Sequence, residues 1–390
     1  MLSGFAELMT NRYHASHIFI YIFIIGASVF FAFLSQLDLC KLKGIKGTKK
    51  QKQIEIYFQR SCLFMSFFIL WFFSAFADCG ADRLAYRNIF LESTVMSIFD
   101  GWQEPGFVIF NLVFRLLGDN SQIILIAIST VTLGLIYCTL YELRNEINIG
   151  YAVLIYGALF YVQSLSLMRM YMAAAMLFWG IRYLKREEYV KYGLVILATT
   201  MIHYSSLIIV LPIILIYFFY TQKYNFSTHL LVISTGMCAA FLVLSICAPL
   251  LSSISVFARF QRYLENVSFG GIGVAQVVYN LPMCLLILAA FDKIKADYRR
   301  IFCSYMACHF FIAMLSYVIT ILGRAVSLFS VLYLFILPYC IQIIDRKIKT
   351  KRYKILFHLC IIGFLMFRFL NYIGEYAFID MVIPYKNILL

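Results

Sequence analysis

The sequence predicts an all-α polytopic membrane protein, and three observations support this class. Of the 390 residues, 63% are hydrophobic and 13% are charged, and the mean hydropathy is +0.86. Soluble domains are typically about 45–50% apolar and about 25% charged. Apolar runs of about 20 residues recur along the chain, and each can cross a hydrocarbon layer about 30 Å thick. We therefore expect a single integral membrane domain over residues 1–390, whose membrane helices carry the function.

Basic segments between the apolar runs predict the orientation of the helices. The formal net charge is +14, a balance that by itself would also suit a nucleic-acid-binding protein. The Lys and Arg residues, however, cluster in short connections, as the positive-inside rule requires of cytoplasmic loops. We therefore expect no nucleic-acid partner. The strongest basic segments are 41–53, 185–191, 292–300 and 345–354.

Twelve membrane spans satisfy both the apolar runs and a cytoplasmic position for these basic segments. The number of spans between successive basic segments must be even if all of these segments are cytoplasmic. This holds only if the short run 106–118 does not cross, so we expect a re-entrant or interfacial helix within an outer loop at 78–121. Both termini then lie outside. The expected spans are residues 17–39, 61–77, 122–141, 149–168, 170–184, 192–206, 207–220, 229–250, 274–291, 301–321, 326–344 and 355–373.

A group of cations falls on the outer side of this topology, where the positive-inside rule disfavours them. A guanidinium at the centre of a bilayer costs roughly 2.5–3.5 kcal/mol on insertion scales, so such residues usually mark a pathway or a binding site. Gathered around one cavity, these cations would form an anion site that faces outwards. They are Arg83, Arg87, Arg169, His203, Arg259, Arg262, Arg324 and Lys386.

The early outer loop holds the first candidate residues. Asp82 and Tyr86 lie four residues apart, as do Arg83 and Arg87, so each pair shares one face of a helix. A solvated interfacial helix with local charge pairs is the alternative. Glu104 precedes a proline, which fits the first turn of a helix. At that N-terminus Glu104 either stabilises the helix dipole or contacts a sugar hydroxyl.

Arg169 and His203 each stand at the end of an apolar run. Arg169 opens a run whose next turn carries three alanines, at 173–175, and small residues let neighbouring helices approach closely. His203 ends the span 192–206, and an unperturbed pKa near 6.5 would let it act as a general base or a phosphate ligand. A structural hydrogen bond is the alternative for His203.

Two further outer segments carry arginines. Arg324 falls in a tight hairpin between two spans, and Arg259 and Arg262 lie three apart in the outer loop 251–273. The glycines of that loop suggest a flexible segment that could act as a lid.

Several fixed arginines can bind a diphosphate through bidentate, charge-assisted hydrogen bonds. In a partly dehydrated cavity they would also stabilise a departing pyrophosphate. The sequence contains no DxD, HExxH or CxxC motif and no dense carboxylate cluster. We therefore expect no metal and no cofactor, with arginines as the electrophilic groups.

Several stretches resemble the EpsG family of Wzy-like polymerases of bacterial exopolysaccharide, capsule and O-antigen. The similarity covers roughly residues 70–390, and its most specific element is the arginine-to-histidine block 169–212. The other stretches are DRLAYRNIF followed by EPGF, then GRAVSLFS, and a terminal VIPYK.

The resemblance implies a multi-pass glycosyltransferase with a GT-C-like fold in the bacterial cytoplasmic membrane, active on its extracytoplasmic side. The donor would be an undecaprenyl-diphosphate-linked oligosaccharide, and the acceptor the terminal sugar of a second lipid-linked repeat. Flippase and chain-length regulator proteins are the further partners that it implies. The expected diphosphate ligands are Arg169, Arg324, Arg83, Arg87 and Arg262, and the candidate catalytic bases are His203, Asp82 and Glu104.

Three other functions stay open. A flippase for lipid-linked oligosaccharide also needs arginines for a diphosphate, but it should place them at mid-depth and show two structural repeats. A ligase that moves finished polymer to another acceptor uses nearly the same chemistry as a polymerase. An ordinary transporter or a non-catalytic scaffold is the third.

Overall fold

The structure is a computed structural model in which helices dominate. Apart from one isolated antiparallel bridge between Ala77 and Asn387, every regular element in the described part of the chain is a helix. The all-helical class predicted from composition is therefore confirmed for these residues. The structure describes residues 12–38, 48–99, 103–221, 274–316 and 322–389.

The chain divides into two compact units, and each is described by itself. Unit 1 comprises Met1–Trp179, Ala198–Tyr204 and Tyr333–Leu390, and unit 2 comprises Gly180–Leu197 and Ser205–Leu332. The helix α10 (Met168–Lys185) begins in unit 1 and ends in unit 2, whereas α11 (Tyr189–Ile202) begins in unit 2 and ends in unit 1.

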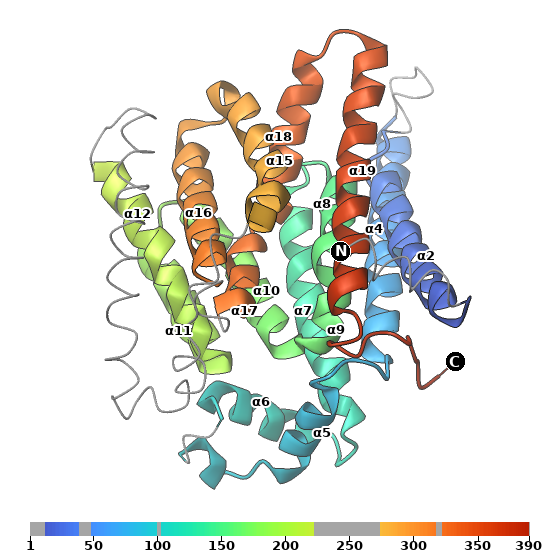
Figure 1. Ribbon diagram of the computed structural model, residues 1–390, viewed down its shortest axis with the longest axis vertical. Coiled ribbons are helices and arrows are strands. Elements are labelled where there is room, and N and C mark those ends of the chain that lie inside the picture. Colours follow the sequence, from blue (N-terminus) through green and yellow to red (C-terminus); the bar gives the residue numbers. More distant parts are fainter. Residues whose placement is uncertain (1–11, 39–47, 100–102, 222–273, 317–321, 390) are drawn as a thin grey trace. The chain divides into compact units, whose positions relative to one another are not determined.

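Unit 1 is a bundle in which α2 packs against α4 and α8, α4 against α7, and α8 against α18 (Figure 1). Its elements are α2 (Arg12–Leu34), α4 (Lys49–Ala75), α5 (Arg83–Glu92), η1 (Met96–Ile98), α6 (Pro105–Arg115), α7 (Gln122–Leu143), α8 (Ile149–Tyr156), the π-helical η2 (Gly157–Tyr161), α9 (Val162–Ser166), α18 (Tyr333–Lys347) and α19 (Lys351–Tyr376).

The bundle is centred on the continuous stretch from α8 to α9. Of its most apolar window 83% is buried, against 11% for α19. Polar side chains tie neighbouring helices to this core. The hydroxyl of Ser66 on α4 lies 2.9 Å from that of Ser28 on α2 and 2.8 Å from that of Tyr137 on α7. Such hydrogen bonds hold helices together where apolar burial alone gives little preference between partners.

Unit 2 is organised around α16, which packs against α12, α15 and α17. A short 3₁₀ segment, η3, precedes α12 and follows the end of α11, so the chain bends at His203 and does not continue as one helix. The elements are η3 (Tyr204–Ile209), α12 (Val210–Thr221), α15 (Val274–Ala290), η5 (Phe291–Lys293), α16 (Ala296–Leu315) and α17 (Leu322–Ser330).

Within the described residues, five helical segments are long and apolar enough to cross a membrane. The expected span 229–250 and the expected lid at 251–273 lie outside the described residues, and the count of twelve spans stays a prediction. The predicted short helix is present as α6, with 11 residues. At 1.5 Å per residue it is about 16 Å long, too short for a hydrocarbon layer of about 30 Å. The five long segments are Ser16–Leu34, Lys49–Ala75, Gln122–Leu143, Ile149–Ser166 and Lys351–Tyr376.

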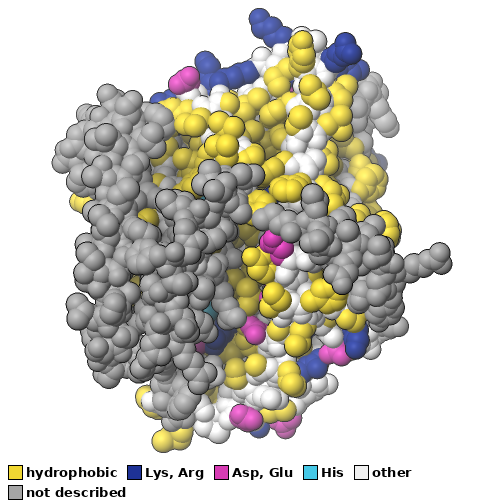
Figure 2. Space-filling view, in the orientation of Figure 1, with side chains coloured by type: hydrophobic (Ala, Val, Ile, Leu, Met, Phe, Trp, Pro, Cys, Tyr) yellow, Lys and Arg dark blue, Asp and Glu magenta, His cyan; other side chains and the backbone are white. Residues whose placement is uncertain are grey.

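The two ends of unit 1 differ in charge. One end, called the basic end, carries the segment 345–354 between α18 and α19, which contains six Lys and Arg residues. The hydroxyl of Tyr151, near the start of α8, lies 2.6 Å from Nδ1 of His358 on α19, so the turn before α8 is at this same end. Figure 2 shows Lys and Arg side chains at the end where α18 passes to α19, with hydrophobic side chains along the helices below.

The opposite end of unit 1 carries α5, α6 and the C-terminal tail. The side chain of Gln122, at the start of α7, donates to the carbonyl of Ala75, the last residue of α4. The tail is held by main-chain hydrogen bonds, among them Asp78 N to the carbonyl of Lys386 at 2.7 Å. Both α5 and α6 pack against α7, so this segment lies across the end of the bundle (Figure 1).

Candidate active site

An ion pair between Arg169 and Glu104 forms the centre of the site at the opposite end of unit 1. Nη1 of Arg169 lies 2.6 Å from Oε2 of Glu104, with 20% and 9% of the two side chains exposed. The same nitrogen donates to Oε1 of Gln103 at 3.1 Å, and the guanidinium carbon lies 5.0 Å from the ring centroid of Phe107. Because water is largely excluded, this charge pair is stronger than one at the surface.

The local sequence explains why Glu104 reaches Arg169. Glu104 has the extended backbone, φ −67° and ψ 129°, that a residue before proline prefers, and Pro105 opens α6. Glu104 is therefore the N-cap residue, as the sequence predicts. Its carboxylate makes no capping hydrogen bond to α6, so both oxygens are available to partners on other helices.

Arg169 is placed by a break between two helices. α9 ends at Ser166, Leu167 adopts φ −87° and ψ 48°, and α10 begins at the next residue. Arg169 thus lies in the first turn of α10, where its main-chain N–H donates to the hydroxyl of Tyr86 at 3.5 Å. The alanines at 173–175 are fully buried, in agreement with the close helix packing expected there.

His203 comes to the second oxygen of Glu104. It is the first residue after α11, and its Nδ1 lies 3.7 Å from Oε1 of Glu104. The main-chain N–H of Tyr204 donates to the same oxygen at 3.4 Å. Glu104 therefore stands between Arg169 on one side and His203 on the other.

A glycine brings α6 close enough to α11 for these contacts. A Cβ added at Gly106 would lie 2.8 Å from both the Cβ and the carbonyl oxygen of Met201. Real Cβ atoms essentially never make so short a contact, so any larger residue would push α6 away from the end of α11 and separate Glu104 from His203.

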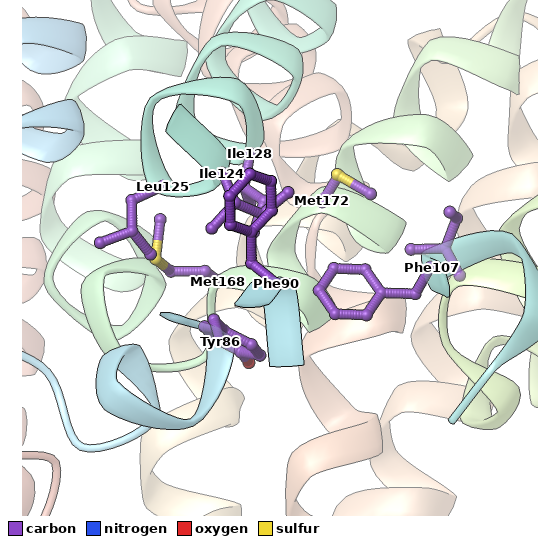
Figure 3. Packing of buried hydrophobic residues seen from close by; sticks show 9 residues of the cluster. Tyr86, Phe90, Phe107, Ile124, Leu125, Ile128, Met168 and Met172 are labelled. Carbon is purple, nitrogen blue, oxygen red and sulfur yellow. The ribbon is translucent and has the colours of Figure 1, made fainter. Parts of the chain in front are cut away.

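An apolar cluster supports the site (Figure 3). It joins α5, α6, α7, α10 and the end of α11, and Phe107 belongs both to this cluster and to the contact with Arg169. Because these side chains fix the helix ends on which the polar groups stand, the site is held rigidly. The cluster consists of Tyr86, Phe90, Phe107, Ile124, Leu125, Ile128, Met168, Met172 and Ile202.

The electrostatics keep Glu104 charged. Burial, the largest single influence, raises the pKa of Glu104, but the interaction with His203 and the charge of Arg169 together outweigh it and lower the pKa. A carboxylate that stays ionised at neutral pH accepts hydrogen bonds and orients its partners, and it is a poor proton donor.

Arg169 keeps one edge of its guanidinium for a ligand. Nη1 is used by Glu104 and Gln103, whereas Nε is buried and has no hydrogen-bond partner. Nη2 likewise has none among the described residues. Nε and Nη2 are the two donors that bind a phosphate or carboxylate side-on. An anion that reached this edge would find two donors and would not have to displace Glu104.

The structure gives Arg83 a different role from the one expected. Its side chain is 3% exposed, and the guanidinium donates to the carbonyls of Ser74, Ala77 and Leu165 at 2.7, 2.6 and 3.1 Å. These carbonyls belong to the ends of α4 and α9. Arg83 thus satisfies buried main-chain groups with each of its three guanidinium nitrogens, and its role as a diphosphate ligand stays a prediction.

The remaining described candidates, Arg87 and Asp82, form no hydrogen bond or ion pair with Glu104, Arg169 or His203. Arg87 pairs with Asp78 at 3.0 Å and with Gln122 at 3.1 Å. Asp82 is the N-cap residue of α5, and its carboxylate makes no hydrogen bond to any of the three.

Two predicted arginines cannot be compared with this cluster. Arg324 falls on α17, in unit 2, and its side chain is outside the described part. Arg262 and Arg259 also lie outside the described residues.

Sequence reasoning missed several residues of the site. Gln103 directly precedes Glu104, Phe107 follows Pro105 by two residues, and Tyr204 directly follows His203. A polar residue next to a predicted helix cap was the available signal for Gln103. No sequence signal indicates that the ring of Phe107 lies under Arg169, since that contact depends on how α6 meets α10.

An all-helical membrane protein with a half-buried Glu–Arg–His cluster at one end of its helices is the class that this fold and site define. Comparison with known families gives the particular group: the EpsG family model matches residues 60–387, and the chain belongs to the EpsG family. Membership points to a polysaccharide-polymerase-like membrane protein. No curated protein and no solved structure matches the chain.

Proposed function

We propose that the protein is a glycosyltransferase that polymerises undecaprenyl-diphosphate-linked oligosaccharide repeats into an exopolysaccharide, capsule or O-antigen. The observation that carries the proposal is the unused edge of Arg169 beside the Glu104–His203 pair, in a chain of the EpsG family. The acceptor is the terminal sugar of a second lipid-linked repeat.

Arg169 is the proposed ligand of the donor diphosphate. Its Nε–H and Nη2–H can donate side-on to two phosphate oxygens. The N-terminus of α10, where Arg169 stands, adds a favourable dipole for a negative charge. As the bond to the sugar breaks, negative charge grows on the leaving diphosphate, and donors already fixed in place stabilise that charge.

His203 is the proposed general base. With Nδ1 facing the ionised Glu104, the ring would carry its proton on Nδ1 and leave Nε2 to accept the proton of the acceptor hydroxyl. The hydroxyl oxygen then forms a bond to the anomeric carbon of the donor, while the bond from that carbon to the diphosphate oxygen breaks. The electron pair of that bond leaves with undecaprenyl diphosphate.

The supporting roles stay as proposals. Arg324 and Arg262 are candidates for further diphosphate contacts, Arg87 for a weaker one, and Asp82 is the substitute base. The position of the cluster supports an extracytoplasmic active site, because it lies at the end of unit 1 opposite the basic segment 345–354, which the positive-inside rule assigns to the cytoplasm.

The test uses the purified full chain in lipid nanodiscs with lipid-linked repeats extracted from cells that lack the protein. Longer chains together with free undecaprenyl diphosphate would support the polymerase. Transfer of finished polymer to a non-polymer acceptor would instead indicate a ligase, and movement of intact lipid-linked repeats across vesicles without new bonds would indicate a flippase. Either of the last two results would overturn the proposal.

A further inference from the structure

A polar cavity of about 290 Å³ lies at the basic end of unit 1, away from the candidate active site. The end of α2, the first half of α4, the end of α7 and the start of α8 surround it. No acidic residue is among the described residues that line it. The lining includes Gln36, Gln59, Arg60, Tyr141, Arg144 and Asn145.

Two arginines are held in this cavity by one tyrosine. The guanidinium carbon of Arg144 lies 4.1 Å from the ring centroid of Tyr141, and that of Arg60 lies 5.9 Å away. Nε of Arg60 donates to the tyrosine hydroxyl at 3.2 Å, and Nη1 of Arg144 donates to the tyrosine carbonyl at 2.7 Å. Stacking on an aromatic face and one hydrogen bond each position the two guanidinium groups.

Among the described residues, the other donors of these two arginines have no hydrogen-bond partner. In the described part of the chain neither Arg60 nor Arg144 forms an ion pair, and each keeps at least two N–H nitrogens unused. Two cations held close together without a counter-charge favour binding of an anion.

Amide side chains build the walls of the cavity. Gln36 donates to the carbonyls of Arg144 and Ile147 at 3.0 and 3.1 Å and accepts from the N–H of Ile149 at 2.6 Å, which fixes the turn between α7 and α8. Gln59 donates to the carbonyl of Leu37 at 3.0 Å. Hydrogen bonds to the main chain thus fix the walls of the cavity, and the donors of the two arginines are the polar groups that remain available to a ligand.

The cavity lies where charged residues adjoin apolar helical segments, and lipid phosphates lie at boundaries of this kind. The apolar helix α7 ends at Leu143, and Arg144 follows immediately. On α4 the charged first turns end at Arg60, and the apolar part of that helix follows. Ile56 and Leu63 line the cavity beside the arginines, and Ile56 is exposed. An apolar wall beside the cations can contact the acyl chain of a lipid, whereas a free phosphate has no apolar group to bury against it.

We propose that this cavity binds the phosphodiester headgroup of an anionic phospholipid of the cytoplasmic leaflet, with Arg60 and Arg144 as its ligands. Juxtamembrane cations attract such lipids in general. Here the two guanidinium groups, the ring of Tyr141 and the apolar wall together define one site. The proposal does not depend on the glycosyltransferase reaction.

Native mass spectrometry of the purified full chain in a neutral detergent tests the site. The probes are dioleoyl phosphatidylglycerol and, as the uncharged comparison, dioleoyl phosphatidylcholine. We expect one phosphatidylglycerol retained tightly by the wild type and retention at least about tenfold weaker in the double variant R60A/R144A. The matched control, R346A/R352A, removes the same charge from the same end outside the cavity and should retain the lipid normally.

Two further arms keep the result unambiguous. R60K/R144K preserves both charges but not the forks, and it should fold as the wild type does and still lose most of the retention. Inorganic phosphate should leave the bound lipid in place. Equal loss in R346A/R352A, equal retention of phosphatidylcholine, or full displacement of the lipid by phosphate would each overturn the assignment.

Discussion

Arg83, which is buried, and Arg169, which is half-buried, lie at the same end of unit 1 and have different roles. Arg83 donates to three main-chain carbonyls. Arg169 pairs with Glu104 through Nη1 alone, and its Nε and Nη2 have no hydrogen-bond partner among the described residues. A guanidinium whose donors are all satisfied inside the protein stabilises the fold. One with an unused edge beside a carboxylate and a histidine is equipped to bind a ligand.

The two arginines are nevertheless connected. The carbonyl of Leu165 that Arg83 binds lies close before the break at Leu167, after which α10 and Arg169 begin. Gly80 also approaches this point, because a Cβ added there would clash with the carbonyl oxygen of Leu165. Arg83 therefore contributes to the site only through the position of the helix that carries Arg169.

Replacing Arg169 should have the largest effect on activity. R169A should lower polymer formation by at least about 10³-fold, since it removes the donors to the leaving diphosphate. R169K keeps a charge for Glu104 but loses the side-on edge, and we expect a loss of about 10²-fold. The measurement is polymer length and free undecaprenyl diphosphate in the nanodisc assay.

The control for this pair is Arg115→Ala. Arg115 is on α6 in the same outer segment, where it pairs with Asp119 and donates to the carbonyl of Ser93 at 3.0 Å, and it makes no ion pair with Glu104. Its loss should leave polymer formation within about twofold, because exposed ion pairs contribute little. Normal polymer from R169A would remove Arg169 from the proposed site.

Replacing Arg83 should act on stability. R83M removes three hydrogen bonds from buried carbonyls, which we expect to cost about 3–5 kcal/mol of unfolding free energy. Thermal unfolding in detergent measures the loss, and the fraction that stays folded should keep a normal KM for the lipid-linked donor. A normal Tm together with a raised KM would instead support Arg83 as a ligand of the diphosphate.

Enlarging Gly106 tests the packing that brings the site together. G106A should cost about 1–3 kcal/mol through overpacking against Met201, and it should lower polymer formation because Glu104 moves from His203. The matched control is G134A on α7, where an added Cβ meets nothing within 4 Å. That variant should keep the Tm or raise it slightly. The same Tm for both variants would contradict the packing argument.

Glu104→Gln should give the smallest effect on stability, and its pH dependence identifies the cause. The pKa of Glu104 is lowered in the folded protein, so its charge stabilises the fold above the unfolded pKa of about 4.3 and ceases to do so as the pH falls through the lower folded value. E104Q should cost about 1–2 kcal/mol near pH 7. The difference in Tm from the wild type should shrink below about pH 4, and a difference independent of pH would show that the charge of Glu104 does not matter.

The three residues that meet in the cluster could be predicted from the sequence by one criterion. Glu104, Arg169 and His203 are polar residues at the boundary of an apolar run, where a helix starts or ends, and helix ends are where a membrane protein can place polar groups together. The same criterion selected Arg83 and Arg87, because residue type and spacing do not reveal which donors are already satisfied. The contributions of Gly106 and Phe107 were not predictable, since both depend on the distance between helices far apart in the chain.

The sequence by itself determined that the chain is helical and that its apolar runs suit a membrane. That the basic segments and the outer cations fall on different sides of the membrane stays a prediction from the sequence. These properties follow from composition and from the cost of placing charge in hydrocarbon, which act locally. The tertiary structure alone decided that Glu104 stands between Arg169 and His203 and that Arg83 is enclosed by carbonyls. Those outcomes depend on how helix ends approach one another, and that approach is the summed result of packing over the whole unit.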